Sequence, residues 1–201
     1  MKLVSKYNLK PEKKSEKRSK QHNPELKHHL IWDITELTGV SIFARYELMV
    51  KAVISSPYAS FNVVGSNTIA KSFIRIINTI NPQLKFRFFK TFDEAIRIIS
   101  KKISVNDNSE FKIKETDYYA NFIDLWQKNP EFREVNNYRY KLLQLDQWKY
   151  VSPESSYKAS YCVLEGNIIL FNCEGFIKVQ HVENTYRMLE DIMTRIGYDE
   201  N

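Results

Sequence analysis

Glycine, proline and cysteine are scarce in this chain, with five, six and two of them among 201 residues. The sequence contains no glycine-rich phosphate loop, no nucleophile elbow and no closely spaced set of histidine and carboxylate ligands. Phosphate-binding, hydrolase and metal-dependent chemistry each need such residues at short, fixed spacings. We therefore expect a protein that is not an enzyme and that holds no cofactor or metal.

The two cysteines, Cys162 and Cys173, are too few for a zinc site, and we expect both to be buried thiols. No apolar run approaches the roughly 20 residues that cross a bilayer. The N-terminal sequence MKLVSKYNLKPEKK lacks the apolar core of a secretory signal. With 43% hydrophobic residues, the chain has material for one or two domains, which we expect to be cytoplasmic and without a transmembrane segment.

The C-terminal segment, residues 157–201, predicts a β-hairpin followed by a helix. Residues 159–164 and 168–173 favour strands, and they flank Glu165-Gly166-Asn167, a typical hairpin turn. From 178 to 196 apolar residues recur every three or four positions before Gly197, which indicates an amphipathic helix. A hairpin and one helix are too little to be stable alone, so another segment must cover them.

Residues 28–104 predict strands that alternate with helices. We expect the strands at 29–34, 61–64 and 85–89, and the helices at 42–54, 69–80 and 92–99. Helix boundaries are marked by Ser41, by Asn81-Pro82, and by Thr91 or Asp93. This alternation is typical of right-handed crossover units in a largely parallel sheet.

Joined with the C-terminal segment first, these elements resemble the STAS-like domain family, which is the fold of the bacterial anti-sigma factor antagonists. The resemblance is to its divergent versions in sensory regions of bacterial signalling proteins such as histidine kinases. It is carried by residues 31–40 (IWDITELTGV), 62–66 (NVVGS) and 89–99 (FKTFDEAIRII). It implies an α/β fold with a mixed, mostly parallel sheet, an N-terminal-type β-hairpin and covering helices, assembled from residues 157–201 plus 28–102.

The resemblance also implies a partner-binding surface at the loop and helix start that contain Thr38, Ser41, Phe43 and Arg45. In the phosphorylated antagonists a kinase modifies a serine at the start of this helix. Phe43 takes that position here, so we do not expect a phosphoserine switch. From the residues themselves we expect Ser41 to cap the helix and Asp33 to hydrogen-bond a neighbouring loop.

Gly65, Ser66 and Asn67 precede another expected helix, whose first backbone amides are able to receive a phosphate or carboxylate. Helix capping by Ser66 or Asn67 explains the same motif, so anion binding and capping remain alternatives. Three further histidines have no evident partner in the sequence, and we expect them at the surface: His28, His29 and His181.

Positive charge is concentrated at the N-terminus. Residues 1–30 contain nine Lys or Arg and three Glu, and the remainder contains 21 residues of each sign. We expect residues 1–27 to form a basic, disordered tail, which is able to bind nucleic acid or an anionic membrane surface or to act as a solvated linker. Nucleic acid is the less expected partner, because few aromatic residues accompany the cations. The candidate residues are Lys13, Lys14, Lys17, Arg18 and Lys20.

The intervening segment, residues 105–156, is rich in aromatic residues and is too apolar for a free linker. We expect a connector subdomain with a helix at 117–128 and a strand at 138–145. Its aromatic side chains are expected to pack against neighbouring elements, and an aromatic cage for a small ligand is the alternative.

The reversed order of the two halves allows three arrangements: closure within one chain, a domain-swapped dimer, or a fragment of a longer array. We expect the halves to assemble, within or between chains. The resulting expectation is a noncatalytic sensory or protein-interaction module of a bacterial signal-transduction system, whose partner is another protein or a second copy. The alternative is a nucleic-acid or membrane-surface binder that uses the basic tail.

Overall fold

The computed structural model describes residues 28–54, 58–65, 68, 71–72, 75, 79, 86–106 and 117–197. Within these ranges the chain is an α/β protein with a nine-stranded sheet. Its elements are β1 (His28–Asp33), β2 (Leu37–Val40), α1 (Ile42–Ile54), β3 (Tyr58–Val64), β4 (Arg87–Phe89), α3 (Phe92–Asn106), α4 (Asp117–Trp126), β5 (Glu131–Val135), β6 (Tyr138–Leu143), the 3-10 turn η1 (Asp146–Trp148), β7 (Lys149–Val151), β8 (Lys158–Leu164), β9 (Ile168–Ile177) and α5 (Val179–Ile196).

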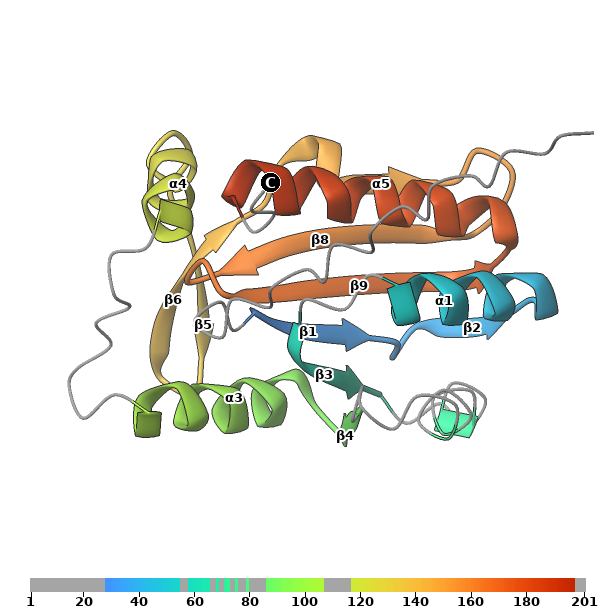
Figure 1. Cartoon of the computed structure of the whole chain (residues 1–201), viewed down its shortest axis with the longest axis horizontal. Helices are drawn as coiled ribbons and strands as arrows, with labels where there is room; N and C mark the ends of the chain where they lie inside the picture. Colours follow the sequence, from blue (N-terminus) through green and yellow to red (C-terminus); the bar gives the residue numbers. More distant parts are fainter. Residues whose placement is uncertain are drawn as a thin grey trace, which may run out of the picture.

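The strand order is β4-β3-β1-β9-β8-β6-β5, and two short strands lie off this path, β2 beside β9 and β7 beside β8 (Figure 1). Neighbouring strands in the series β4, β3, β1 and β9 pair in parallel, whereas those in the series β9, β8, β6 and β5 pair antiparallel. The expected mixed sheet is therefore confirmed, but it is parallel only in the half formed by β4, β3, β1 and β9. The antiparallel half is larger than expected because the aromatic-rich segment contributes β5, β6 and β7 to the same sheet.

The two halves of the expected domain meet inside this one chain. Strand β9 pairs in parallel with β1, from His29 opposite Ile168 to Asp33 opposite Asn172. The predicted C-terminal hairpin is confirmed, with Gly166 in the left-handed region at φ 73° between β8 and β9. The hairpin thus lies in the middle of the sheet, between the N-terminal strands and β6 (Figure 1). Domain swapping between two chains stays a prediction.

Strand β9 continues past the end that the sequence predicts. Gly175 does not release the chain: at φ 78° it pairs with Leu37, and β9 continues beside β2 to Ile177, with a register shift on β2 between Leu37 and Gly39. A side chain at this position would lie 2.6 Å from the carbonyl oxygen of Ser156, so only glycine fits without a backbone shift. Residues 37–40, expected as a loop, form β2 because the extended part of β9 supplies their hydrogen-bonding partner.

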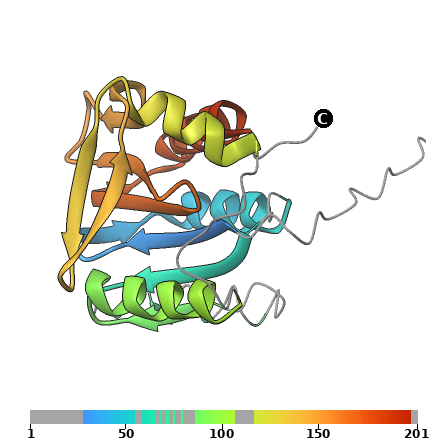
Figure 2. The same cartoon turned by 90° about the vertical axis from the view of Figure 1, so that its left-hand side faces the viewer.

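Each face of the sheet packs against different helices (Figure 2, in which α3 lies at the bottom and α4 and α5 at the top). One core joins sheet residues such as Trp32 and Phe171 to helices α1, α4 and α5. The other core joins Ile31 and Leu170 to the buried face of α3. Because side chains alternate along a strand, adjacent residues of β1 and β9 belong to opposite cores.

The helix boundaries follow local chemistry. The hydroxyl group of Thr91 accepts a hydrogen bond from the Glu94 amide at 3.2 Å, as expected for the start of α3. Helix α5 ends at Gly197, whose left-handed backbone lets its amide bond the carbonyl oxygens of Met193 and Thr194. Of the helix expected at 69–80, only 71–72, 75 and 79 belong to the described residues, and these are helical.

Both cysteines are buried and free, which confirms the expectation of buried thiols. Cys173 belongs to the core under α5 and Cys162 to the core under α3, so the two thiols lie on opposite faces of the sheet. In the described part of the chain, no helix has the length and apolar character needed to cross a membrane.

Candidate protein-interaction surface

Four large apolar side chains are exposed where α1 and α5 begin. We call this set the helix-start patch. Its members are Ile42 (79% exposed), Phe43 (75%), Tyr46 (62%) and Val179 (44%). Isolated apolar side chains are common on protein surfaces, but a cluster of this kind is typical of an interaction site.

Strand pairing brings the two helix starts together. Val40 pairs with Ile177, and the Ser41 amide donates to the Ile177 carbonyl oxygen at 2.9 Å. The hydroxyl group of Ser41 accepts a hydrogen bond from the Ala44 amide at 3.2 Å, which confirms its expected role as the cap of α1. The helix-start patch therefore combines residues from both halves of the domain.

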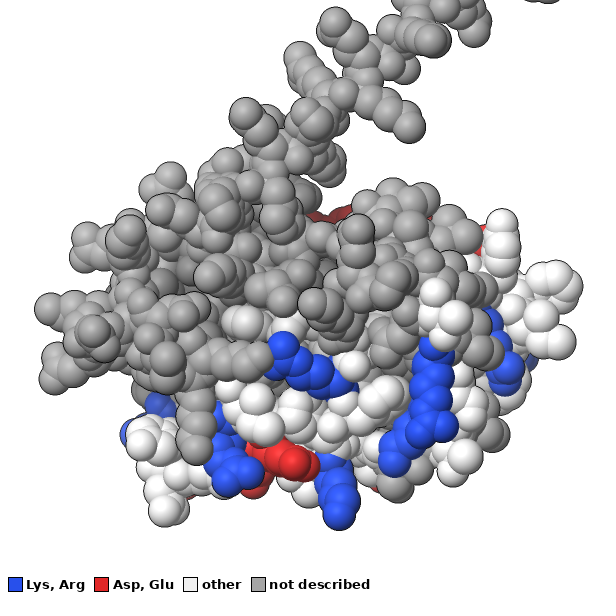
Figure 3. All heavy atoms as spheres, turned by 60° about the horizontal axis from the view of Figure 1, so that its bottom comes forward, with Lys and Arg blue, Asp and Glu red and all other residues white. Residues whose placement is uncertain are grey.

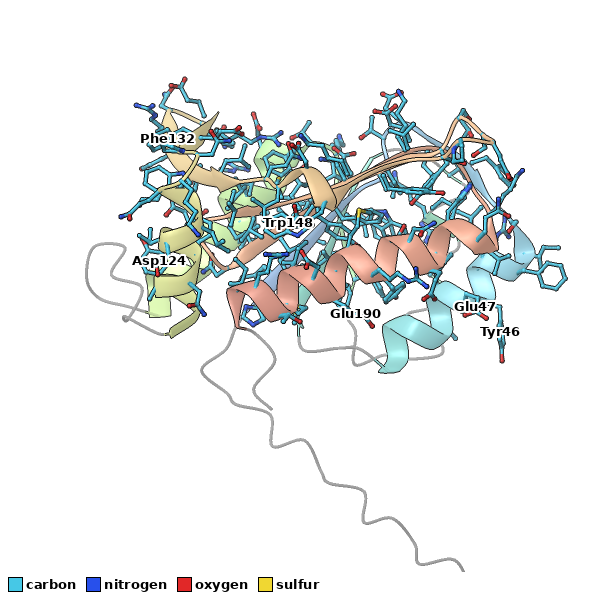
Figure 4. All side chains as sticks on the ribbon, turned by 90° about the horizontal axis from the view of Figure 1, so that it is seen from above. Tyr46, Glu47, Asp124, Phe132, Trp148 and Glu190 are labelled. Atoms are coloured by element: carbon cyan, nitrogen blue, oxygen red, sulfur yellow. The ribbon has the colours of Figure 1, made fainter. Side chains whose placement is uncertain are left out.

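The helical period decides which residues of α1 are exposed. Ala44 and Leu48 face the core, and this places Ile42, Phe43 and Tyr46 on the outer side. Tyr46 points away from the body of the protein in Figure 4. This arrangement leaves the first turn of an apolar helix uncovered.

Phe176, which is 40% exposed, lies outside the patch. A side chain built at Gly39 would come within 2.9 Å of its ring, so glycine at this position permits the close approach. Ile177, the next residue, belongs to the core under α1 and α5, so alternation along β9 places Phe176 on the opposite face of the sheet.

Charges of both signs lie next to the patch. Helix N-termini carry a partial positive charge, and neither α1 nor α5 has an acidic residue in its own first turn. Arg45, whose Nε donates to the Val40 carbonyl oxygen at 3.0 Å, and the exposed Lys178 add two cations. They are opposed by Glu47 on α1 and by Glu154, whose carboxylate accepts from Gln180 in the first turn of α5 at 3.4 Å.

The four partner-binding candidates from the sequence lie in one place. Phe43 is a member of the patch, exposed Thr38 and half-buried Arg45 lie beside it, and Ser41 forms the cap. The sequence interpretation missed Val179, because this residue fits the apolar period of the C-terminal helix and was expected on its buried stripe.

The motif Gly65-Ser66-Asn67 gains no support as an anion site. Gly65 is buried, has φ 129°, and its amide already donates to the Phe89 carbonyl oxygen at 3.2 Å. Ser66 and Asn67 lie outside the described residues, as does the basic tail with Lys13, Lys14, Lys17, Arg18 and Lys20.

His181, at the start of α5, lies close to a serine side chain, and a serine next to a histidine is the arrangement of a catalytic pair. The Nε2 atom of His181 is 3.3 Å from the Ser155 hydroxyl group, and its Nδ1 accepts from the Lys178 amide at 3.1 Å. Because Nδ1 accepts, the ring proton is on Nε2, so His181 donates to Ser155. A general base would need a free nitrogen at that position.

The His181 ring stabilises the fold instead. It is fully buried and stacks on Tyr157 with ring centroids 4.4 Å apart. Burial, followed by the charge of Lys178, lowers the pKa of His181 and favours the neutral ring. The expectation of a surface histidine at this position was wrong, because the ring both caps the helix and packs against an aromatic side chain.

The expectation was wrong for His28 and His29 as well, which are 1% and 7% exposed. The Nδ1 atom of His29 lies 2.8 Å from the Ser60 hydroxyl group, and the Asn62 amide group donates to the same hydroxyl at 2.9 Å. Burial, with a smaller effect of His29, lowers the pKa of His28 from 6.5 to about 4. Parallel pairing of β1 between β3 and β9 is what buries these residues.

Asp33 has the local role expected for it. Its carboxylate accepts from the Thr35 amide at 2.9 Å and from the Thr35 hydroxyl group at 2.6 Å. These bonds stabilise the turn that separates β1 from β2.

The opposite side of the molecule, around α3 and β4, carries charges of both signs (Figure 3). Exposed Lys90 and Arg97 lie near Asp93 and Glu94. This mixture is typical of a solvated surface, and it gives a nucleic-acid function no specific support. Among the described residues, no group of three or more histidine, cysteine or carboxylate side chains is placed to hold a metal ion.

No family model matches this chain. A search of curated proteins and a search of solved structures likewise found no match. The function therefore has to be argued from the helix-start patch itself.

Proposed function

We propose that the protein is a noncatalytic protein-interaction or sensory module of a bacterial signal-transduction system. The observation that carries the proposal is the helix-start patch, an exposed apolar cluster at the end of the sheet. The signalling context comes from the STAS-like resemblance, which implies an interaction surface at Thr38 to Arg45. The binding surface is thus supported by two independent arguments, one from sequence resemblance and one from exposure.

The size of the patch supports binding to a protein. An aromatic side chain buries about 150–250 Å² when it is covered, so Phe43 and Tyr46 together offer roughly 270 Å² at their observed exposures. Covering such a surface contributes about 25 cal/mol per Å² before the entropic costs of association are subtracted. Aromatic residues at the centre of an interface are also the side chains that most often dominate binding energy.

Site-specific photo-crosslinking tests the proposal. A photoreactive phenylalanine analogue is placed at position 43 of the full chain, and in a second protein at Tyr138, another exposed aromatic residue that lies on the β5–β6 hairpin. In cells that naturally produce the protein, we expect one discrete adduct from position 43 and none from position 138. The yield of this adduct should fall when Tyr46→Asp is combined with the photoreactive residue at position 43.

Equal crosslinking from both positions, or none from position 43, would contradict the proposal. Salt-sensitive retention on nucleic acid or anionic vesicles that disappears when residues 1–27 are removed would select the alternative function instead.

A further inference from the structure

We infer that β5, the strand at one edge of the sheet, pairs antiparallel with β5 of a second copy of this chain, so that the two Phe132 residues lie opposite each other. The inference is independent of the helix-start patch, which belongs to other elements. It follows from the open backbone edge of β5 and from the order of charges along the strand.

Within the described residues, β5 has a neighbouring strand on one side only, because it ends the series of strands in the sheet. It pairs with β6 over its whole length, but β6 pairs with β8 only at Leu142 and Leu143. The β5–β6 hairpin therefore projects from the sheet, and it lies at the left-hand margin of the molecule in Figure 2. An edge strand of this kind presents backbone groups that are able to pair with another strand.

The hairpin turn determines which backbone groups of β5 point outward. Asn136 and Asn137 have φ 51° and 67°, the type I′ geometry of a two-residue loop, so Val135 and Tyr138 form a hydrogen-bonded pair. Hydrogen-bonded and non-hydrogen-bonded pairs alternate along an antiparallel ladder. Three residues before Val135, Phe132 therefore belongs to a non-hydrogen-bonded pair.

Lys141, which lies opposite Phe132 on β6, agrees with this alternation. Its amide donates to the Glu165 carboxylate at 2.6 Å, and its carbonyl oxygen accepts from the Glu165 amide at 3.1 Å, so both groups are directed away from β5. The backbone amide and carbonyl groups of Phe132, and those of Glu134 two residues later, therefore point to the open side of the strand.

The order of charges selects one register. In a two-fold symmetric antiparallel pair, opposite residues share a face of the sheet, so the symmetry axis passes beside a residue that pairs with its own copy. With Phe132 at the axis, Glu131 of each copy lies opposite Arg133 of the other, and facing opposite charges stabilise a sheet. The two Phe132 residues then exchange backbone hydrogen bonds, and the Glu134 amide donates to the Pro130 carbonyl oxygen of the other copy. With Arg133 or Glu134 at the axis, like charges would face each other instead.

The side chains of β5 are positioned for this register. The guanidinium group of Arg133 lies 3.9 Å from the centre of the Phe92 ring, on the face covered by α3. Glu131 is exposed and shares this face, because side chains two residues apart lie on the same side of a strand. Phe132 lies on the opposite face, 40% exposed, with its ring edge-on to Trp126 at a centroid distance of 5.2 Å. Two such rings that meet across the axis cover part of each other's exposed surface.

We expect a weak dimer, because an interface of one strand pair is small. Stable interfaces bury about 800 Å² on each partner, and a strand of five residues buries less than this. Tyr138 lies on β6, two strand spacings or about 10 Å from the second copy's β5, so it still serves as the crosslinking control. An adduct between two copies is recognised by its mass.

Sedimentation velocity of the full chain over a wide range of concentrations tests the inference. We expect the wild-type protein to show a monomer–dimer equilibrium. Glu131→Arg and Arg133→Glu each place like charges opposite one another, and two-fold symmetry makes each substitution act twice, so either should weaken association by about five- to thirtyfold. A mixture of the two variants should associate again, because every arginine of one variant then faces a glutamate of the other.

Glu190→Arg, at an exposed position on α5 (Figure 4), is the matched control and should leave association unchanged. Circular dichroism and urea denaturation check that each variant is folded. Because Glu131 is exposed, Glu131→Arg decides the outcome by itself if Arg133→Glu, which loses the contact with Phe92, does not fold.

A wild-type protein that stays monomeric at every concentration would overturn the inference. A dimer that neither charge reversal weakens, or a mixture that does not associate again, would overturn it too. A dimer that Phe43→Asp disrupts and Glu131→Arg does not would overturn it in favour of a contact through the helix-start patch. The crosslinking at position 43 is measured separately, so failure of this inference leaves the proposed function to its own test.

Discussion

Protonation of His28 should couple the stability of the sheet to pH. The ring is buried in β1 at 1% exposure, and burial lowers its pKa from 6.5 to about 4. In the unfolded chain the ring takes up a proton below pH 6.5, whereas in the folded chain it remains neutral until about pH 4. The unfolded state therefore binds more protons in this interval, and acid favours unfolding.

The size of the change in the free energy of unfolding follows from the shift in the pKa of His28. Each pKa unit corresponds to 1.36 kcal/mol, so the free energy of unfolding should fall by about 3 kcal/mol between pH 7.5 and pH 4. By pH 4.5 about 2.5 kcal/mol of this should already be lost. Domains are commonly stable by only 5–15 kcal/mol, so this is a large fraction of the total.

Urea denaturation at several pH values measures this loss, with tryptophan fluorescence as the signal. The wild-type protein is compared with His28→Gln, whose side chain does not titrate in this range. The variant will be less stable at neutral pH if its new side chain packs poorly, but the informative quantity is the slope against pH. We expect the variant to lose about 2.5 kcal/mol less than the wild type between pH 7.5 and pH 4.5.

Equal slopes for the two proteins would refute the reasoning, because the proton uptake would then belong to other groups. His181 also has a lowered pKa and contributes in the same direction, so His28→Gln should reduce the slope without removing it. Burial acts to raise the pKa of the Asp191 carboxyl group, but hydrogen bonds from Arg195 and Trp148 outweigh it and lower that pKa, so this group affects stability only at lower pH.

Three further outcomes are expected. Gly175→Ala should destabilise the fold by more than about 2 kcal/mol in urea denaturation, because φ 78° is strained for alanine and the Cβ atom meets the Ser156 backbone; an unchanged midpoint would contradict this. Cys162 and Cys173, whose thiol pKa values burial raises to about 12, should not react with a thiol reagent at pH 8 until urea is added, and rapid labelling of the native protein would be evidence against their burial. Trp148→Phe should cost about 2–4 kcal/mol, since it removes a buried indole whose N–H donates to a carboxylate on α5 at 2.8 Å, and a loss within 0.5 kcal/mol would count against that role.

Elements with strong local signals were predicted from the sequence. The hairpin of β8 and β9 and helices α1, α3 and α5 have a clear period and clear boundary residues, and the structure confirms them. Strands β2, β5 and β7 have four, five and three residues, and the sequence interpretation missed all three. Such short strands exist because a neighbouring strand supplies their hydrogen bonds, and no local pattern reports that neighbour.

The same distinction applies to the candidate site. Phe43 and Ser41 were identified from sequence resemblance and from helix capping, both of which depend on adjacent residues. Val179 joined them only through the pairing of β2 with β9, which connects segments more than a hundred residues apart. The burial of His28 and His29 likewise reflects pairing across the sheet, and that of His181 reflects its packing on Tyr157, so none of the three could be told from a surface histidine in the sequence.

The sequence by itself determined most helices, the central hairpin and the two buried thiols, because periodicity and turn chemistry act over a few residues. Tertiary structure alone decided that β9 pairs with β1 inside one chain, that the aromatic segment extends the same sheet, and that two helix starts meet at one apolar surface. These features depend on which strands become neighbours, and strand order is set by the burial of whole faces and not by any single stretch of sequence.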